Sequence, residues 1–255
     1  MKIVTAVKIV PDDQDITVNG DRTLNYSKAR PVVSTYDLNA IEIASTTAAA
    51  NGGSNVVVSV GPASIDETKN NKNILARGVE SLTLCADDSL ADIDARGTAA
   101  VLAAAIKTVE GFDLVICGDG SADVYAQQTE VQLAEALGLP VVTSVSAISF
   151  EGNTLVAERT LENEKETVEV EMPAVISVVP DIAQPRICGM RDIMQAGKKP
   201  VNKLALADLG VAAACGTEVL ETLAPVPAPR KKVIYDAGVD GDLDKFVAAI
   251  AEAIR

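Results

Sequence analysis

The sequence contains no histidine and no tryptophan, and these two absences narrow the functions that it can serve. Without histidine there is no His-containing catalytic triad, no histidine metal ligand and no usual general base near neutral pH. Aromatic residues make up only 3% of the chain, which disfavours an aromatic platform for single-stranded nucleic acid. The absences favour a protein that binds a reactive group over one that supplies it.

Basic residues are also scarce, with 22 Lys and Arg against 36 Asp and Glu and a net charge of −14. Binding to nucleic acid draws its affinity from clustered Lys and Arg, so we expect no nucleic-acid partner. The same charge argues against an anionic membrane surface. The net charge is compatible with a soluble protein that has basic partners or no partner.

The cysteines and the apolar runs point to the cytoplasm. The four cysteines form no CxxC pair, which is typical of reduced thiols. No apolar run reaches roughly 18 residues, so we expect no membrane insertion. The opening stretch MKIVTAVKIVPDD is too short and too quickly charged for a signal peptide.

Short apolar runs alternate with helical stretches in the first half of the chain. The pattern predicts strands at 2–10, 55–60, 79–87 and 112–117, and helices at 36–50, 64–78, 91–109 and 123–138. Strands that are apolar on both faces belong to a parallel sheet covered by helices on both sides. We therefore predict a doubly wound, mostly parallel, Rossmann-like α/β fold.

The pattern changes after residue 145. Turn signals at Gly152-Asn153 and at 162–165 predict an antiparallel extension, and PAVISVV returns as a buried strand. Prolines between 225 and 229 indicate a stiff linker before a short strand at 232–237 and a helix at 242–255. We predict an α/β domain at 1–200 and a C-terminal arm at 201–255, which packs on a partner or folds back.

The stretch VICGDGSADVYAQQTE, residues 115–130, is the strongest candidate for a binding loop. Gly118 and Gly120 follow a strand and allow the backbone to approach a ligand closely. The unsatisfied N–H groups of the next helix start can hold a phosphate without a basic side chain. The spacing matches neither a Walker loop nor a G-x-G-x-x-G loop. An ordinary strand-to-helix turn with an Asp cap is an equally weighted alternative.

Side chains of this loop add to the candidate site. Asp119 and Asp123 suit ribose hydroxyls or an adenine amino group better than phosphate. Neutral donors are supplied by Ser121, Gln127, Gln128 and Thr129. Cys117, just before the glycines, reads as a small buried apolar residue.

Other strand ends lead to the same crevice, because ligands bind beyond the carboxyl ends of parallel strands. The candidates are Ala6, Val7, Lys8, Ser34, Thr35, Tyr36, Asp37 and Val60. Lys8 is a phosphate partner or a strand-end lysine that reaches solvent.

The segment MRDIMQAGKKP combines Met190, Ile193 and Met194 with basic residues. Methionine beside basic residues suits an adaptable docking surface. The alternative is a helical turn that faces the core and carries solvated lysines.

Several segments together resemble the β subunit of electron transfer flavoproteins. They follow one another over nearly the whole chain: TAVKIVPD, STYDLNAIEIA, VVSVGPAS, LVICGDGSADVYAQQT, VAERTLENEKETVEVEMPAVISV and PRICGMRDIMQAGKKP. The motifs YDLNAIEIA and GDGSADVYAQQ resemble those of the FixA-type branch. A free-standing ATP-binding stress-type protein and a scaffold with a degenerate site remain as alternatives.

The resemblance implies an adenine-nucleotide-binding fold that pairs with an α subunit carrying an electron-transferring FAD. The β subunit itself holds AMP or, in bifurcating members, a second FAD that takes a hydride from NADH. Electrons then pass between acyl-CoA dehydrogenase-type flavoenzymes and an acceptor. The family's usual GKQAIDDD is GDGSADVY here, and its NPF is STY, so AMP and FAD both stay open.

The same resemblance assigns residues. Met190 matches an apolar anchor for the dehydrogenase, and Glu166 faces the mobile flavin domain of the α subunit. The implied nucleotide site comprises Ala6, Val7, Lys8, Ser34, Thr35, Tyr36, Asp37, Val60, Cys117, Gly118, Asp119, Gly120, Ser121, Ala122, Asp123, Gln127, Gln128 and Thr129.

Overall fold

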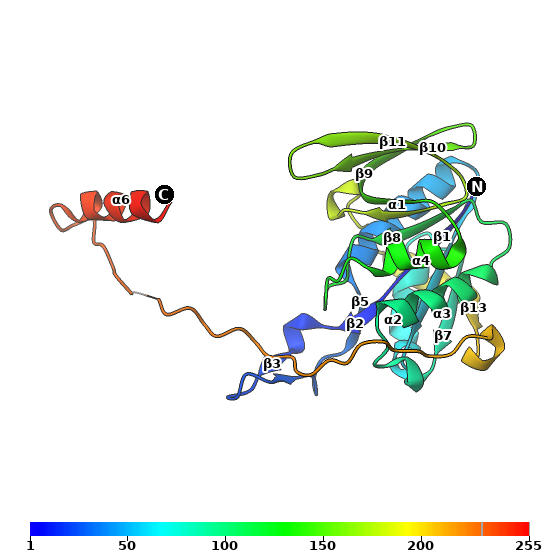
Figure 1. The fold of residues 1–255 in the computed structure, drawn as a ribbon, viewed down its shortest axis with the longest axis horizontal. Coiled ribbons are helices and arrows are strands. Elements are labelled where there is room, and N and C mark those ends of the chain that lie inside the picture. Colours follow the sequence, from blue (N-terminus) through cyan, green and yellow to red (C-terminus); the bar gives the residue numbers. More distant parts are fainter. Residues whose placement is uncertain (231, 255) are drawn as a thin grey trace. The chain divides into compact units, whose positions relative to one another are not determined.

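The computed structural model describes residues 1–230 and 232–254, which form two compact units (Figure 1). The first unit comprises Met1–Thr17 and Asn25–Glu221. The second comprises Val18–Leu24 and the residues from Thr222 onward.

Within the described residues, the first unit is built on a nine-stranded sheet in the order β11-β10-β9-β12-β8-β1-β6-β7-β13. The strands are β1 (Lys2–Ala6), β6 (Ser54–Gly61), β7 (Ser81–Ala86), β8 (Leu114–Gly118), β9 (Val141–Glu151), β10 (Thr154–Thr160), β11 (Lys165–Glu171), β12 (Ala174–Val178) and β13 (Val201–Lys203). Neighbouring strands pair in parallel along the part of the sheet ordered β9-β12-β8-β1-β6-β7-β13, while β10 pairs antiparallel with β9 and β11. The predicted doubly wound sheet with an antiparallel extension is confirmed.

Helices cover both faces of this sheet (Figure 1). They are α1 (Thr35–Ala50), α2 (Thr68–Leu75), α3 (Ala95–Lys107), α4 (Thr129–Leu137) and α5 (Met190–Ala196). On one face, Ile3 and Ile116 pack against the alanines of α1. On the other, Val4 and Val115 pack against α3 and α4. Alternate residues of one strand therefore reach both layers, which explains why these strands are apolar throughout.

The predicted strand at 2–10 is two strands. β1 ends at Ala6, and β2 (Ile9–Pro11) pairs antiparallel with β5 (Pro31–Val33) outside the main sheet. The chain leaves the sheet at Lys8, whose N–H donates to the Asp37 carboxylate at 2.7 Å. At this point the backbone N–H group donates to a buried side chain and not to a neighbouring strand.

The second unit contains a bridge between Thr23 and Leu223 and the helix α6 (Asp242–Ala253). The predicted helix at the end of the chain is confirmed over these residues, and none of them is buried. The predicted strand at 232–237 is wrong, since no strand forms there. Two further short strands are β3 (Thr17–Val18) and β4 (Leu24–Asn25). None of the described helices has both the length and the apolar character needed to cross a membrane.

Candidate functional site

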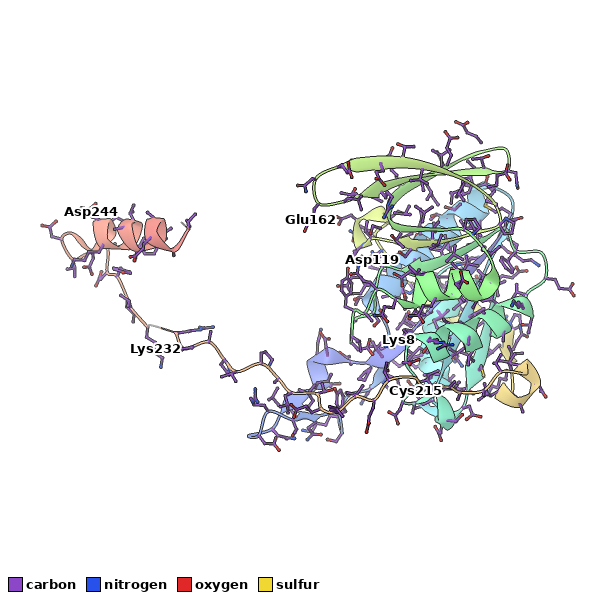
Figure 2. All side chains as sticks on the ribbon, viewed as in Figure 1. Lys8, Asp119, Glu162, Cys215, Lys232 and Asp244 are labelled. Carbon is purple, nitrogen blue, oxygen red and sulfur yellow. The ribbon has the colours of Figure 1, made fainter. Side chains whose placement is uncertain are left out.

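Three predicted segments meet at the carboxyl edge of the sheet. Ala6 at the end of β1 lies opposite Cys117 on β8 and Val58 on β6. The start of α1 joins them, because the Ser34 N–H donates to the Lys8 carbonyl at 3.0 Å. The structure thus brings the ends of β1 and β8 and the start of α1 to one place (Figure 2, where Lys8 and Asp119 are labelled).

Asp37 is the buried carboxyl at the centre of this region, with 4% of its surface exposed. Burial raises the pKa of Asp37 to about 7, although the backbone N–H groups of Lys8 and Gly118 act in the opposite direction. The side chain therefore takes up a proton near neutral pH, where an ordinary Asp carries a full charge.

This pKa makes stability depend on pH. The folded chain holds the Asp37 proton more tightly than the unfolded chain, whose ordinary pKa is 3.8. The stabilisation is complete below pH 3.8 and is lost as pH rises through about 7. We expect the melting temperature of the wild type, minus that of Asp37→Asn, to fall between pH 4 and pH 8 in thermal unfolding. Parallel pH profiles for the two proteins would contradict the assignment.

The Lys8 side chain is paired with a carboxylate, so a ligand phosphate would have to compete for it. Its ammonium lies 2.6 Å from the Asp123 carboxylate, which also accepts from the Ser121 hydroxyl. Burial acts to raise the pKa of Asp123, but these two hydrogen bonds and the Lys8 charge outweigh it and lower the pKa. A phosphate at Lys8 must therefore displace Asp123 or share the cation with it.

The two glycines of the loop are required by the protein's own packing. A Cβ atom on Gly118 would lie 2.6 Å from the Asp37 carboxylate, and one on Gly120 would lie 2.6 Å from Cε2 of the Tyr125 ring. The sequence-based explanation, in which the glycines make room for a ligand, is therefore not needed to account for either residue. Their first role is to fit Asp37 and Tyr125 against the backbone.

Tyr125 organises the loop. Its hydroxyl donates to Asp119 at 2.8 Å, its ring lies 5.0 Å from that of Tyr36, and its φ of 49° is left-handed. The hydrogen bond to Asp119 raises the pKa of Tyr125 to about 12. Gln127 also donates to Asp119 at 3.1 Å. Asp119 thus contacts the loop itself, where the sequence favoured a ribose or an adenine.

The helix after this loop starts later than predicted. α4 begins at Thr129 and not at Asp123, because Tyr125 and Gln127 both take left-handed φ angles that a helix excludes. Its N-cap residue is Gln128, whose side chain makes no capping hydrogen bond. The alternative of a simple turn with an Asp cap is therefore wrong, and so is a helix that opens at the glycines.

The loop keeps backbone donors that no other group uses. Within the described residues, the N–H groups of Gly120, Ser121 and Asp123 donate to no protein acceptor. The Ala122 N–H donates to the Ser34 hydroxyl at 3.3 Å, and this hydroxyl makes no cap bond in α1. Unpaired backbone N–H groups gathered in one short loop can bind an anion.

A cavity of about 250 Å³ lies beside the loop, lined by Thr35 and Ala122, by the apolar Val10, Val33 and Leu38, and by polar residues that include Asp12 and Asp13. A larger hollow of about 630 Å³ lies at the opposite edge, where Lys2, Ser54 and Ser81 begin their strands. The smaller cavity is the candidate binding site, because open parallel sheets bind ligands beyond the carboxyl ends of their strands.

Two predicted residues make no polar contact in this region. Val60 is partly buried near the end of β6 and packs against the apolar cluster that includes Ala6 and Cys117. The Gln128 side chain is exposed and makes no hydrogen bond among the described residues. Glu130, which sequence reasoning missed, lies in the first turn of α4 and is 4% exposed. Burial and the nearby charge of Asp119 raise the pKa of Glu130. A glutamate at a helix start ordinarily indicates only a dipole contact, so the sequence carries no signal for its burial.

The predicted docking segment is exposed. Met190 and Met194 have 82% and 71% of their surface accessible, whereas Ala196 is the buried residue of α5. The alternative of a turn that faces the core is therefore wrong for both methionines. Lys199 is not solvated either, because its ammonium donates to the carbonyls of Leu75 and Val79.

The doubly wound sheet and the loop at its carboxyl edge define the chain as a Rossmann-like α/β protein. The protein-family model described as the electron transfer flavoprotein domain matches residues 23–209 of the chain. The chain therefore belongs to the electron transfer flavoprotein domain family, a family of flavin-binding electron carriers that work with partner proteins.

Proposed function

We propose that the chain is the β subunit of a heterodimeric electron transfer flavoprotein of the FixA-like branch. The match over residues 23–209 supports membership of the family, and the resemblance of STYDLNAIEIA and LVICGDGSADVYAQQT to β subunits carries the choice of subunit and branch. Its α subunit carries the electron-transferring FAD, and this chain holds AMP or a second FAD. The complex works in the cytoplasm, passing electrons between an acyl-CoA dehydrogenase-type flavoenzyme and an acceptor, with NADH as the donor if the second FAD is present.

The free donors of the loop support nucleotide binding. The N–H groups of Gly120, Ser121 and Asp123 would hold a phosphate, and Thr35 with the apolar side chains that line part of the cavity would contact the nucleoside. These residues fit an adenine nucleotide without a basic side chain. The flavin supplies the redox chemistry when it is bound, and this chain binds and orients it.

The charge of the site opposes an ATP-binding protein, the second candidate. Asp37, Asp119 and Glu130 are buried around the loop, and Lys8 is already paired with Asp123. A triphosphate brings several further negative charges and needs lysine or magnesium to offset them. Within the described residues, no cluster of carboxylate and cysteine side chains has the arrangement of a metal site.

The C-terminal part, predicted as an arm from residue 201, supports the pairing. Leu243, Phe246, Val247 and Ile250 recur at helical spacing on α6 and are 64%, 44%, 58% and 42% exposed. An amphipathic helix needs an apolar surface for such a face. We propose that this face packs on the α subunit, and that Met190, Ile193 and Met194 contact the dehydrogenase.

Counting nucleotides tests the proposal. We expect the chain, expressed with the α-subunit gene, to purify as a yellow heterodimer. Release of the ligands by acid should give either one FAD and one AMP, or two FAD in a protein that NADH reduces. A colourless monomer that binds Mg-ATP would contradict the proposed function.

A further inference from the structure

The segment that leads into the docking methionines is fastened to α1 by polar contacts. The Asn39 amide donates to the carbonyls of Pro180 at 2.8 Å and Ala183 at 2.7 Å. One helical turn further on, Glu42 reaches the same segment at Arg186. Both contacts come from α1, whose apolar side is fixed against the sheet.

Glu42 and Arg186 form a three-point contact. The two Glu42 oxygens accept from the Arg186 guanidinium at 2.7 and 2.8 Å, and one of them also accepts from the Arg186 backbone N–H at 3.1 Å. The Arg77 guanidinium donates to the Arg186 carbonyl at 2.8 Å. A fork with two parallel hydrogen bonds fixes direction as well as distance. We call these three residues the Arg186 clamp.

The Glu42–Arg186 pair of this clamp is more buried than an ordinary surface ion pair. The Glu42 side chain is 11% exposed and that of Arg186 is 37% exposed. Burial acts to raise the pKa of Glu42, but the Arg186 hydrogen bonds outweigh it and lower the pKa. Pairs with this geometry and partial burial are stronger than exposed pairs, which contribute little.

The other end of the segment is also held. Ala196 is 1% exposed, and Lys199 donates to the carbonyls of Leu75 and Val79. Between the two fixed ends, Ile187 and Met190 are 98% and 82% exposed, and only Cys188 between them packs against the core. The exposed side chains make no core contact of their own, so their position depends on the fastened ends and on Cys188.

We propose that Glu42, Arg186 and Arg77 are positioning residues that preorganise residues 187–194 for docking. The docking role rests on the proposed function. A segment already in its bound position loses less conformational freedom on association, so the clamp increases affinity for the dehydrogenase without touching flavin or substrate. Its loss raises KM for the partner protein and leaves kcat unchanged.

The test uses Arg186→Gln and Glu42→Gln in the heterodimer, with Arg186→Lys as the conservative variant. We expect amide hydrogen exchange in peptides covering 184–195 to become faster, and KM for a reduced acyl-CoA dehydrogenase to rise about tenfold at constant kcat. Arg186→Lys keeps the charge but loses the fork, and falls in between. Lys203→Gln, which removes the Lys203–Asp66 pair elsewhere, should change neither quantity.

Two results would overturn the proposal: unchanged exchange in 184–195, or faster exchange with an unchanged KM. A loss of melting temperature alone, with the same KM, would reduce the clamp to a structural role. Met190→Ala is the reference for lost contact, since it should raise KM while exchange stays slow. A wild-type heterodimer that takes no electrons from any such dehydrogenase would instead contradict the proposed function, and the exchange measurement separates that failure from a failure of the clamp.

Discussion

Gly120→Val should release the adenine nucleotide from the heterodimer. A side chain at position 120 meets the Tyr125 ring, because even a Cβ atom would lie 2.6 Å from its Cε2 atom. The ring must move, which breaks the 2.8 Å hydrogen bond to Asp119 and the packing on Tyr36. Each of these contacts contributes roughly 1 kcal/mol, so we expect about tenfold weaker retention or more.

Nucleotide content per heterodimer after dialysis measures this effect. Gly20→Val is the control, since a Cβ atom there has nothing within 4 Å and the backbone is not left-handed. Tyr125→Phe keeps the ring but removes the hydroxyl, so it should lose less nucleotide than Gly120→Val. Full nucleotide content in Gly120→Val would show that the site lies elsewhere.

Phe246→Asp combined with Ile250→Asp should prevent the two subunits from assembling. Both residues belong to the exposed apolar face of α6, and no described residue of this helix is buried in the chain itself. Burying one such side chain contributes about 1.5–3 kcal/mol, and a buried unpaired carboxylate costs more than that again. We expect a change from stable heterodimer to separate subunits.

Sedimentation of the purified pair measures assembly. The control combines Ala248→Asp with Lys245→Gln on the opposite side of α6, which makes the net charge more negative by the same amount without touching the apolar face. This control should assemble like the wild type. A double-Asp variant that still forms the heterodimer would contradict the role proposed for the arm.

The fold could be predicted because its signals are local. Strands covered on both faces are apolar throughout, as in β8, and glycines stop the elements where the backbone turns left-handed. Gly138 ends α4 with a φ of 71°, and Gly152 turns the hairpin between β9 and β10 with a φ of 61°. Each of these positions depends on a few neighbouring residues.

The sequence could group the candidate residues but could not give their contacts. They could be grouped because the carboxyl ends of parallel strands meet at one edge of the sheet. The contacts that shape the site depend on distant partners or on rare backbone angles: Asp37 accepts from the Lys8 N–H, and Tyr125 leaves the helical region to reach Asp119. The Arg186 clamp joins residues 144 positions apart. Contacts between residues so far apart in the chain cannot be predicted from a local sequence pattern.

Helix α1 connects the two surfaces that have been discussed separately. Ser34 at its start holds the loop at Ala122, and Glu42 holds the docking segment at Arg186. Eight residues of helix separate these two contacts, about 12 Å along the axis. Because a packed helix moves as a rigid rod, any sliding of α1 changes both ends together. The distance between the loop and the docking segment is therefore set by one helix. Under the proposed function, a nucleotide that rigidifies the loop would also restrain the segment that contacts the dehydrogenase.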